Sequence, residues 1–224
     1  MNKNDKKINL NSFLDKDHAL RDFFMKKHPE EVIDISKYVK YEYDGKSIPQ
    51  NVRSYIKKVT ISNRVKRIGD HAFNGCTNLK SVTIPDSVTE IGQYAFSLCS
   101  SLTSIMIPDS VTSIGDRAFS GCESLASINI LDGVKKISDK TFSGCTNLTS
   151  ITIPDGVTSI GWRAFFDCSS LTSVTIPDIV TSIDEGAFAA CDHLTIHTNN
   201  PIAIEYAEQE GIPVVPLDED LVTL

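Results

Sequence analysis

Apolar positions recur along most of this chain with a fixed period of 23 residues. Four columns of identical residues keep that period, and they consist of phenylalanine, cysteine, isoleucine and leucine. The phenylalanines are Phe73, Phe96, Phe119, Phe142, Phe165 and Phe188, and the cysteines are Cys76, Cys99, Cys122, Cys145, Cys168 and Cys191. One unit reads L-x-x-[VI]-x-I-P-D-x-V-T-x-I-G-x-x-A-F-x-x-C-x-x. A period of this length indicates a repeat array in which each unit packs on its neighbours.

The first part of each unit predicts a short β-strand. Apolar and polar residues alternate there, as in Val82-Thr83-Ile84, which is typical of a strand with one buried face. A proline then ends the strand because it has no N–H for a sheet. We expect the aspartate after it to accept hydrogen bonds from nearby backbone amides. These aspartates are Asp86, Asp109, Asp132, Asp155 and Asp178.

The second part of each unit predicts a short turn that is stable only inside the array. The segment A-F-x-x-C-x-x-L places apolar groups three residues apart, which is typical of a helical or 3₁₀ turn. Such a run is too short to fold alone, so its Phe and Cys are expected to insert between coils. The predicted fold class is an α/β solenoid, mostly short parallel strands with short helical or 3₁₀ turns.

The unit resembles the BspA-type leucine-rich repeat. The segments Ile-Pro-Asp-x-Val-Thr-x-Ile-Gly and Ala-Phe-x-x-Cys carry this resemblance, which covers about residues 56–196. It implies a right-handed curved coil with a cap at each end, and a role in adhesion or protein recognition in surface and secreted proteins. The departures are Leu131 in place of proline, Thr141 in place of alanine, and Ser138 and Asp184 in place of glycine.

Three segments follow from the extent of the repeat. Residues 1–55 are predicted to form an N-terminal cap, with a helix over residues 11–27 and a truncated first coil that begins near Ile48. Residues 56–197 form the solenoid. Residues 198–224 form a C-terminal cap with a helix over 202–210, a helix end at Gly211 and an acidic tail.

Composition and charge exclude several classes of protein. The 224 residues are 41% hydrophobic and 23% charged, as in an ordinary folded domain, and the net charge is −7. From Thr141 onward Arg163 is the only basic residue, so we expect no nucleic-acid partner. A basic cluster at Lys57, Lys58, Arg64, Lys66, Arg67 and Lys80 is interpreted as a solvated face.

The chain is expected to be a monomer without membrane insertion. No apolar run approaches the length of a membrane span, and no signal-peptide pattern is visible near Met1. The expected location is the cytoplasm. The alternative is the cell surface or secretion, if an export signal precedes the given sequence.

The six cysteines allow four interpretations. A straight column of thiols cannot surround a zinc ion tetrahedrally. Disulfides between coils are compatible with the spacing but not with parallel Cβ directions. A catalytic thiol would need one distinguished cysteine, so reduced, buried packing residues are favoured.

The aspartate column offers too few oxygens for calcium, and His193 and His197 do not share one face of a strand. We therefore predict no metal, no cofactor and no enzymatic activity.

The remaining candidate for function is the exposed face of the strands. The side chains that flank each buried Val or Ile point outward there. The predicted partner-binding residues are Lys58, Thr60, Ser81, Thr83, Ser104, Met106, Ser127, Asn129, Ser150, Thr152, Ser173 and Thr175. The preferred hypothesis is a non-catalytic module that binds another protein. One alternative is an adhesin for a host or matrix ligand, and the other is a scaffold whose N-terminal segment docks a partner.

Overall fold

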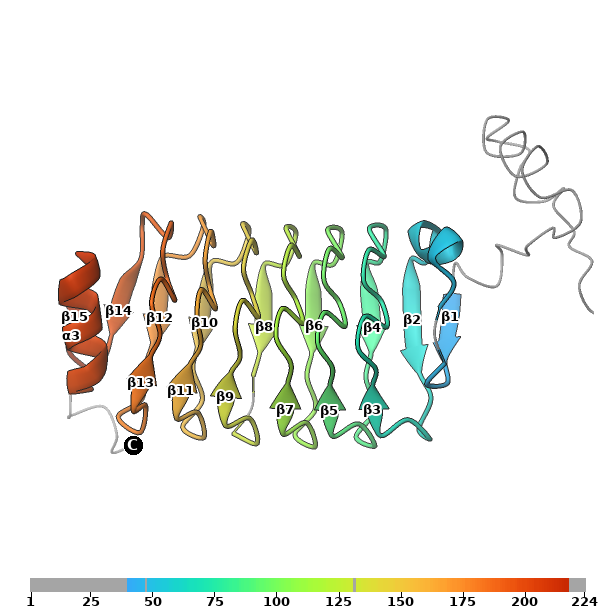
Figure 1. Ribbon diagram of the computed structural model, residues 1–224, viewed down its shortest axis with the longest axis horizontal. Helices are drawn as coiled ribbons and strands as arrows, with labels where there is room; N and C mark the ends of the chain where they lie inside the picture. Colours follow the sequence, from blue (N-terminus) through green and yellow to red (C-terminus); the bar gives the residue numbers. More distant parts are fainter. Residues whose placement is uncertain (1–39, 47, 131, 218–224) are drawn as a thin grey trace, which may run out of the picture.

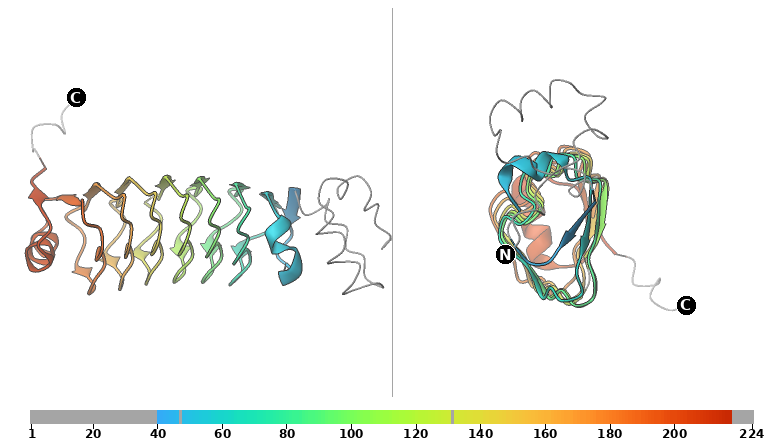
Figure 2. Two further views of the ribbon diagram at one scale, coloured as in Figure 1. Left: turned by 90° about the horizontal axis from the view of Figure 1, so that it is seen from above. Right: turned by 90° about the vertical axis from the view of Figure 1, so that its right-hand side faces the viewer.

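The described residues form an elongated rod of stacked coils. The computed structural model describes residues 40–46, 48–130 and 132–217 (Figure 1). Viewed end-on, successive coils lie over one another (Figure 2). The helix expected over residues 11–27 and the acidic tail beyond residue 217 lie outside the described residues. The solenoid prediction is confirmed, whereas its right-handed sense stays a prediction.

Each complete coil contributes two short strands, so the rod has two rows. The first row consists of β1 (Lys40–Tyr43), β2 (Lys58–Ile61), β4 (Ser81–Thr83), β6 (Ser104–Met106), β8 (Ser127–Asn129), β10 (Ser150–Thr152), β12 (Ser173–Thr175), β14 (Thr195–His197) and β15 (Val214–Val215). The second row consists of β3 (Arg67–Ile68), β5 (Glu90–Ile91), β7 (Ser113–Ile114), β9 (Lys136–Ile137), β11 (Ser159–Ile160) and β13 (Ser182–Ile183). The second row was not predicted, because two residues are too few to show alternation.

All strand pairs are parallel, and their register follows the repeat. Ser150 faces Ser173, and Ser159 faces Ser182. The first row divides into three sheets, β1-β2-β4, β6-β8 and β10-β12-β14-β15. The second row divides into β3-β5-β7 and β9-β11-β13. In the first coil Lys40 faces Lys58, so this coil is shorter than those that follow, and η2 (Gln50–Tyr55) replaces the Ala-Phe-x-x-Cys turn.

The Ala-Phe-x-x-Cys segment forms successive turns rather than a continuous helix. The Cys76 N–H donates to the Phe73 carbonyl at 3.0 Å, which is a 3₁₀-type bond. The Phe73 N–H instead donates to Ala95 of the next coil at 2.7 Å. Two residues per coil adopt a left-handed conformation and interrupt the helix. Among the described residues, helix is confined to η2 and α3 (Pro201–Glu210).

Two columns contain these left-handed residues. The first column is His71, Tyr94, Arg117, Lys140, Arg163 and Gly186, with φ between 51° and 64°. The second column is Gly75, Leu98, Gly121, Gly144, Asp167 and Ala190, with φ between 58° and 75°. Glycine adopts this backbone without steric cost, whereas residues with a Cβ do so at a cost.

The phenylalanines stack through the centre of the rod. Neighbouring rings lie 5.0–5.6 Å apart between centroids, with interplanar angles of 1–16°. All six are buried, so the predicted column is confirmed. Burial of each ring contributes about 1.5–3 kcal/mol, which makes this column a large part of the core.

A tyrosine closes each end of the phenylalanine stack. Tyr43 packs edge-on against Phe73 at 4.9 Å, and Tyr206 of α3 packs edge-on against Phe188 at 6.1 Å. Each hydroxyl also accepts a backbone N–H, from Gly69 at 3.3 Å and from Phe188 at 3.1 Å. At each end of the solenoid, a tyrosine side chain thus supplies the ring contact and the hydrogen-bond acceptor that a neighbouring coil supplies in the interior.

The aspartate that follows the strand proline does not cap its turn. None of the five aspartate carboxylates accepts a hydrogen bond within the described residues, and all five are exposed. A backbone hydrogen bond closes the turn instead. The Val88 N–H donates to the Pro85 carbonyl at 3.0 Å, and equivalent bonds recur in other coils. The expected capping role is therefore wrong, because a backbone bond already closes the turn.

Gly92, Gly115 and Gly161, which follow isoleucine, lie so close to the previous coil that a Cβ would clash with its backbone. A Cβ on Gly115 would lie 2.7 Å from the Gln93 nitrogen, and one on Gly92 would lie 2.8 Å from the Asp70 nitrogen. Neither glycine has a positive φ. Their role in the repeat is thus to let one coil approach the previous one.

Candidate partner-binding surface

The first row of strands presents the predicted binding residues on one face. In β6, Ile105 is 4% exposed while the residues on either side point outward. Ten of the twelve predicted residues are exposed, and Ser173 and Thr175 are partly covered. The parallel register aligns them in two columns, as where Met106 faces Asn129. We refer to these twelve residues as the sheet face.

The sheet face is polar with one apolar exception. Hydroxyl side chains of serine and threonine occupy most of its positions. Met106 is 79% exposed, which makes it the most exposed large hydrophobic residue among those described. The face therefore offers many hydrogen-bonding groups and a single flexible apolar contact.

A shallow groove crosses the sheet face between β8 and β10. These neighbouring strands belong to different sheets. The groove has a volume of about 380 Å³, and four predicted residues line it, namely Ser127, Asn129, Ser150 and Thr152. Two carboxylates, Asp132 and Asp155, lie at its end. These aspartates were predicted in turns and not as part of the binding surface, although their position soon after the strand was a usable signal.

A group of aromatic and cationic residues lies elsewhere, in the turns that follow the second row of strands. His71 stacks on Tyr94 at 4.7 Å, and the Arg117 guanidinium lies 5.2 Å from the Tyr94 ring centroid. Lys140 and Arg163 flank the Trp162 ring at 4.4 and 4.9 Å. We call His71, Tyr94, Arg117, Lys140, Trp162 and Arg163 the ridge.

The cysteine column is structural. Each thiol from Cys99 onward donates to the phenylalanine carbonyl of the preceding coil, as from Cys122 to Phe96 at 3.2 Å. All six cysteines are free and buried. Burial raises the pKa of the Cys76 and Cys122 thiols to about 12, so at neutral pH they are not thiolate nucleophiles. The prediction of reduced packing residues is confirmed.

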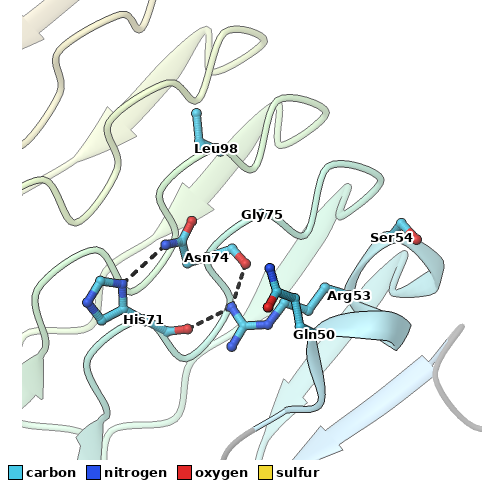
Figure 3. Close-up of a pocket in the computed structure, with 7 residues that line it drawn as sticks. All are labelled: Gln50, Arg53, Ser54, His71, Asn74, Gly75 and Leu98. Carbon is cyan, nitrogen blue, oxygen red and sulfur yellow. Dashed lines mark hydrogen bonds between the residues drawn. The ribbon is translucent and has the colours of Figure 1, made fainter.

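A pocket of about 490 Å³ lies where η2 meets the first complete coil (Figure 3). Arg53 extends along it and donates to the carbonyls of His71, Asn74 and Ile48. In an interior coil the carbonyl equivalent to that of Asn74 accepts an amide from the preceding coil, as Ser97 does from Gly75. Arg53 therefore supplies a donor that a preceding coil would supply, and its hydrogen bonds hold the N-terminal end of the solenoid.

In the residues that the structure describes, no group of three or more His, Cys, Asp or Glu side chains is arranged to hold a metal ion. No helix in the same part of the chain has the length and apolar character needed to span a bilayer.

Comparison with known families assigns the repeat. The model of the BspA type leucine rich repeat region matches residues 47–142 and 117–207, which together are more than half of the chain, with six copies. The chain belongs to the BspA-type leucine-rich-repeat family. The resemblance carried by the Ile-Pro-Asp and Ala-Phe-x-x-Cys segments is therefore correct. Proteins of this BspA-type family are typically surface proteins that mediate interactions, and the family is generally non-catalytic.

Solved structures of other leucine-rich-repeat proteins resemble this BspA-type chain. The leucine-rich-repeat protein TpLRR of T. pallidum has a TM-score of 0.62 and 27% identity, over 79% of this chain and 78% of that one. A leucine-rich cell surface protein of Faecalibacterium prausnitzii has a TM-score of 0.42 and 24% identity, over 73% of this chain and 61% of that one. A search of curated proteins found no match.

Proposed function

We propose that this BspA-type solenoid is a non-catalytic module that binds another protein through its sheet face. The observation that carries the proposal is the alignment of the outward side chains of successive first-row strands on one face. Hydroxyl and amide groups held at the spacing of parallel strands, about 4.8 Å, form a regular set of donors and acceptors for a complementary surface. Rigid strands also hold these groups without further loss of conformational entropy on binding.

The groove between β8 and β10 is the proposed centre of this surface. The sheet face is hollowed there, and polar side chains from two strands line the hollow together with two carboxylates. A partner that inserts an N–H donor or a cationic side chain there would form charge-assisted hydrogen bonds with Asp132 or Asp155.

Arginine substitutions on two strand rows test the proposal. The intact chain is first used to capture and identify a partner, and the affinity of the purified pair is then measured. Ser127→Arg with Ser150→Arg introduces bulk and charge into the groove, and we expect the affinity to fall by at least about tenfold. Ser113→Arg with Ser182→Arg makes the same chemical change at exposed serines of the second row and serves as the control.

The expected result is loss of binding in the groove variant and retention in the control. Equal affinity of both variants and the unsubstituted chain would exclude the sheet face. Deletion of residues 1–39, which ends before β1, tests the scaffold alternative. Binding that disappears with this deletion and survives the groove variant would favour an N-terminal docking element. The adhesin alternative requires export and stays a prediction.

A further inference from the structure

The ridge contains bulky residues where the backbone favours glycine. His71, Tyr94, Arg117, Lys140 and Arg163 have φ between 51° and 56°, and the sixth coil has Gly186 at the equivalent position. A left-handed backbone is disfavoured for residues with a Cβ. Large side chains at these positions therefore indicate a functional role that offsets the conformational cost. Five consecutive coils place such side chains side by side along one edge of the rod.

The side chains of the ridge are held by one another. The Arg117 guanidinium donates to the Tyr94 hydroxyl and lies over the Tyr94 ring. Trp162 lies between Lys140 and Arg163, and Arg163 also lies 5.0 Å from the Phe166 ring centroid. These contacts order long side chains that would otherwise lose conformational entropy on binding a partner.

The cations of the ridge have no carboxylate partner among the residues that the structure describes. Within the described residues, the ion pairs involve Lys46, Arg67 and Lys136 as cations. Arg117, Lys140 and Arg163 form none, although the chain carries a net charge of −7 and contains 29 acidic residues. Three ordered cations on consecutive coils thus remain available to an anionic group from outside.

We propose that the ridge is a second interaction surface, and that it binds an acidic, extended segment of a partner protein. Tyr, Trp and Arg are the residues that contribute most often to binding energy at protein interfaces, and the sheet face contains none of them. Carboxylates of the partner would contact Arg117, Lys140 and Arg163. Apolar side chains of the same segment would pack on Trp162, which is 36% exposed.

A protein segment fits this ridge better than a nucleic acid. Asp116 and Asp139 directly precede Arg117 and Lys140 in the sequence, so the turns that carry these cations also carry carboxylates. A nucleic acid has closely spaced phosphates that cannot avoid these carboxylates. An acidic peptide can place its charges opposite the cations and its apolar residues between them. This proposal goes beyond the sheet-face function and does not depend on it.

Trp162 provides a direct readout because it is the only tryptophan in the chain. The probe is a synthetic peptide of repeated Glu-Leu-Asp units, and the control peptide replaces Glu and Asp with Gln and Asn. We expect the acidic peptide to change the fluorescence of Trp162 saturably and the neutral peptide to leave it unchanged. No change with the acidic peptide would overturn the proposal.

Two variants that lose the same charge separate a specific site from general attraction. The ridge variant is Arg117→Gln with Lys140→Gln and Arg163→Gln, and the control is Lys57→Gln with Lys66→Gln and Lys80→Gln. We expect the affinity for the acidic peptide to fall at least about tenfold in the ridge variant and less than about threefold in the control. An equal loss in both variants would contradict a site on the ridge.

Further measurements keep the proposal testable if the ridge variant is unstable. Arg117→Gln and Lys140→Gln are then measured singly, and each is expected to weaken the peptide at least about threefold while the thermal midpoint is unchanged. Single-stranded DNA of equal charge that displaces the peptide completely would overturn the assignment to an acidic protein segment. The groove variant Ser127→Arg with Ser150→Arg should bind the peptide normally, so failure of one proposal leaves the other intact.

Discussion

At the scale of the residue, phenylalanine and cysteine give the coil its interior. Each interior ring, from Phe96 to Phe165, stacks on the rings of both neighbouring coils. Each thiol from Cys99 onward donates to a carbonyl that already accepts one amide, as the Phe73 carbonyl does from Cys76. The two residue types therefore satisfy different needs. The phenylalanine fills space, and the cysteine adds a weak donor to a buried backbone oxygen.

Removal of a central ring is expected to destabilise the whole rod. In Phe119→Ala the ring that stacks on Phe96 and Phe142 is lost and a cavity remains, so the free energy of unfolding should fall by about 3–5 kcal/mol. Phe166→Ala is the matched control, because that ring is only partly buried. Urea titration measures both variants. Equal destabilisation of the two would contradict the assignment of Phe119 to the core.

At the scale of the element, one buried asparagine forms hydrogen bonds both to the C-terminal helix and to the solenoid. The Asn200 side chain accepts the N–H groups of Ile202 and Ala203 at the start of α3. Its amide donates to three carbonyls of the last coil, those of Pro177, Asp178 and Val180, at 2.8–3.1 Å. This residue is 1% exposed and joins the cap to the solenoid.

Asn200→Ala is expected to loosen the cap. The substitution removes the helix N-cap and leaves buried carbonyls without a donor, so the free energy of unfolding should fall by about 2–4 kcal/mol. Asn199→Ala serves as the control, because Asn199 is exposed and its side chain bonds only to the backbone of Leu217. Calorimetry with hydrogen exchange of α3 measures the effect, and unchanged protection of α3 in Asn200→Ala would contradict this role.

At the scale of the whole molecule, the rod is a linear array. Each coil contacts the coils on either side, so stability is expected to depend on nearest-neighbour interfaces. Coils at an end lose one neighbour and are protected there by a cap instead. The centre of the rod is therefore expected to open less often than its ends.

The reaction of the cysteines with a thiol reagent measures this difference in opening between the centre and the ends of the rod. All six thiols are buried, so a thiol reagent reacts only after a coil opens. At moderate denaturant we expect Cys191 to react before Cys122 and Cys145, and full denaturation should expose all six. Mass spectrometry of labelled peptides gives the order. A single rate for all six thiols would indicate that the rod unfolds as one cooperative unit.

The sequence by itself determined the repeat, the core columns and the exposed positions of the first-row strands. These features follow from a fixed period and from alternation, and both reflect which side chains must leave water. The C-terminal helix was also predictable, since Asn200-Pro201 and Gly211 mark its two ends. Residues such as Phe119 and Ser127 were placed correctly because neighbouring units repeat the same pattern.

Only the tertiary structure decided the second row of strands, the left-handed columns, the groove and the ridge. Tyr94, Arg117 and Trp162 all lie in the variable pair before Ala-Phe. Stacking of the coils is what brings Arg117 onto Tyr94 and Lys140 onto Trp162. The glycines at 75, 121 and 144 carried a signal for one left-handed column, whereas the column of His71 and Lys140 carried only the single glycine Gly186. The physical reason is that these conformations are fixed by hydrogen bonds between coils, which a single unit of sequence does not contain.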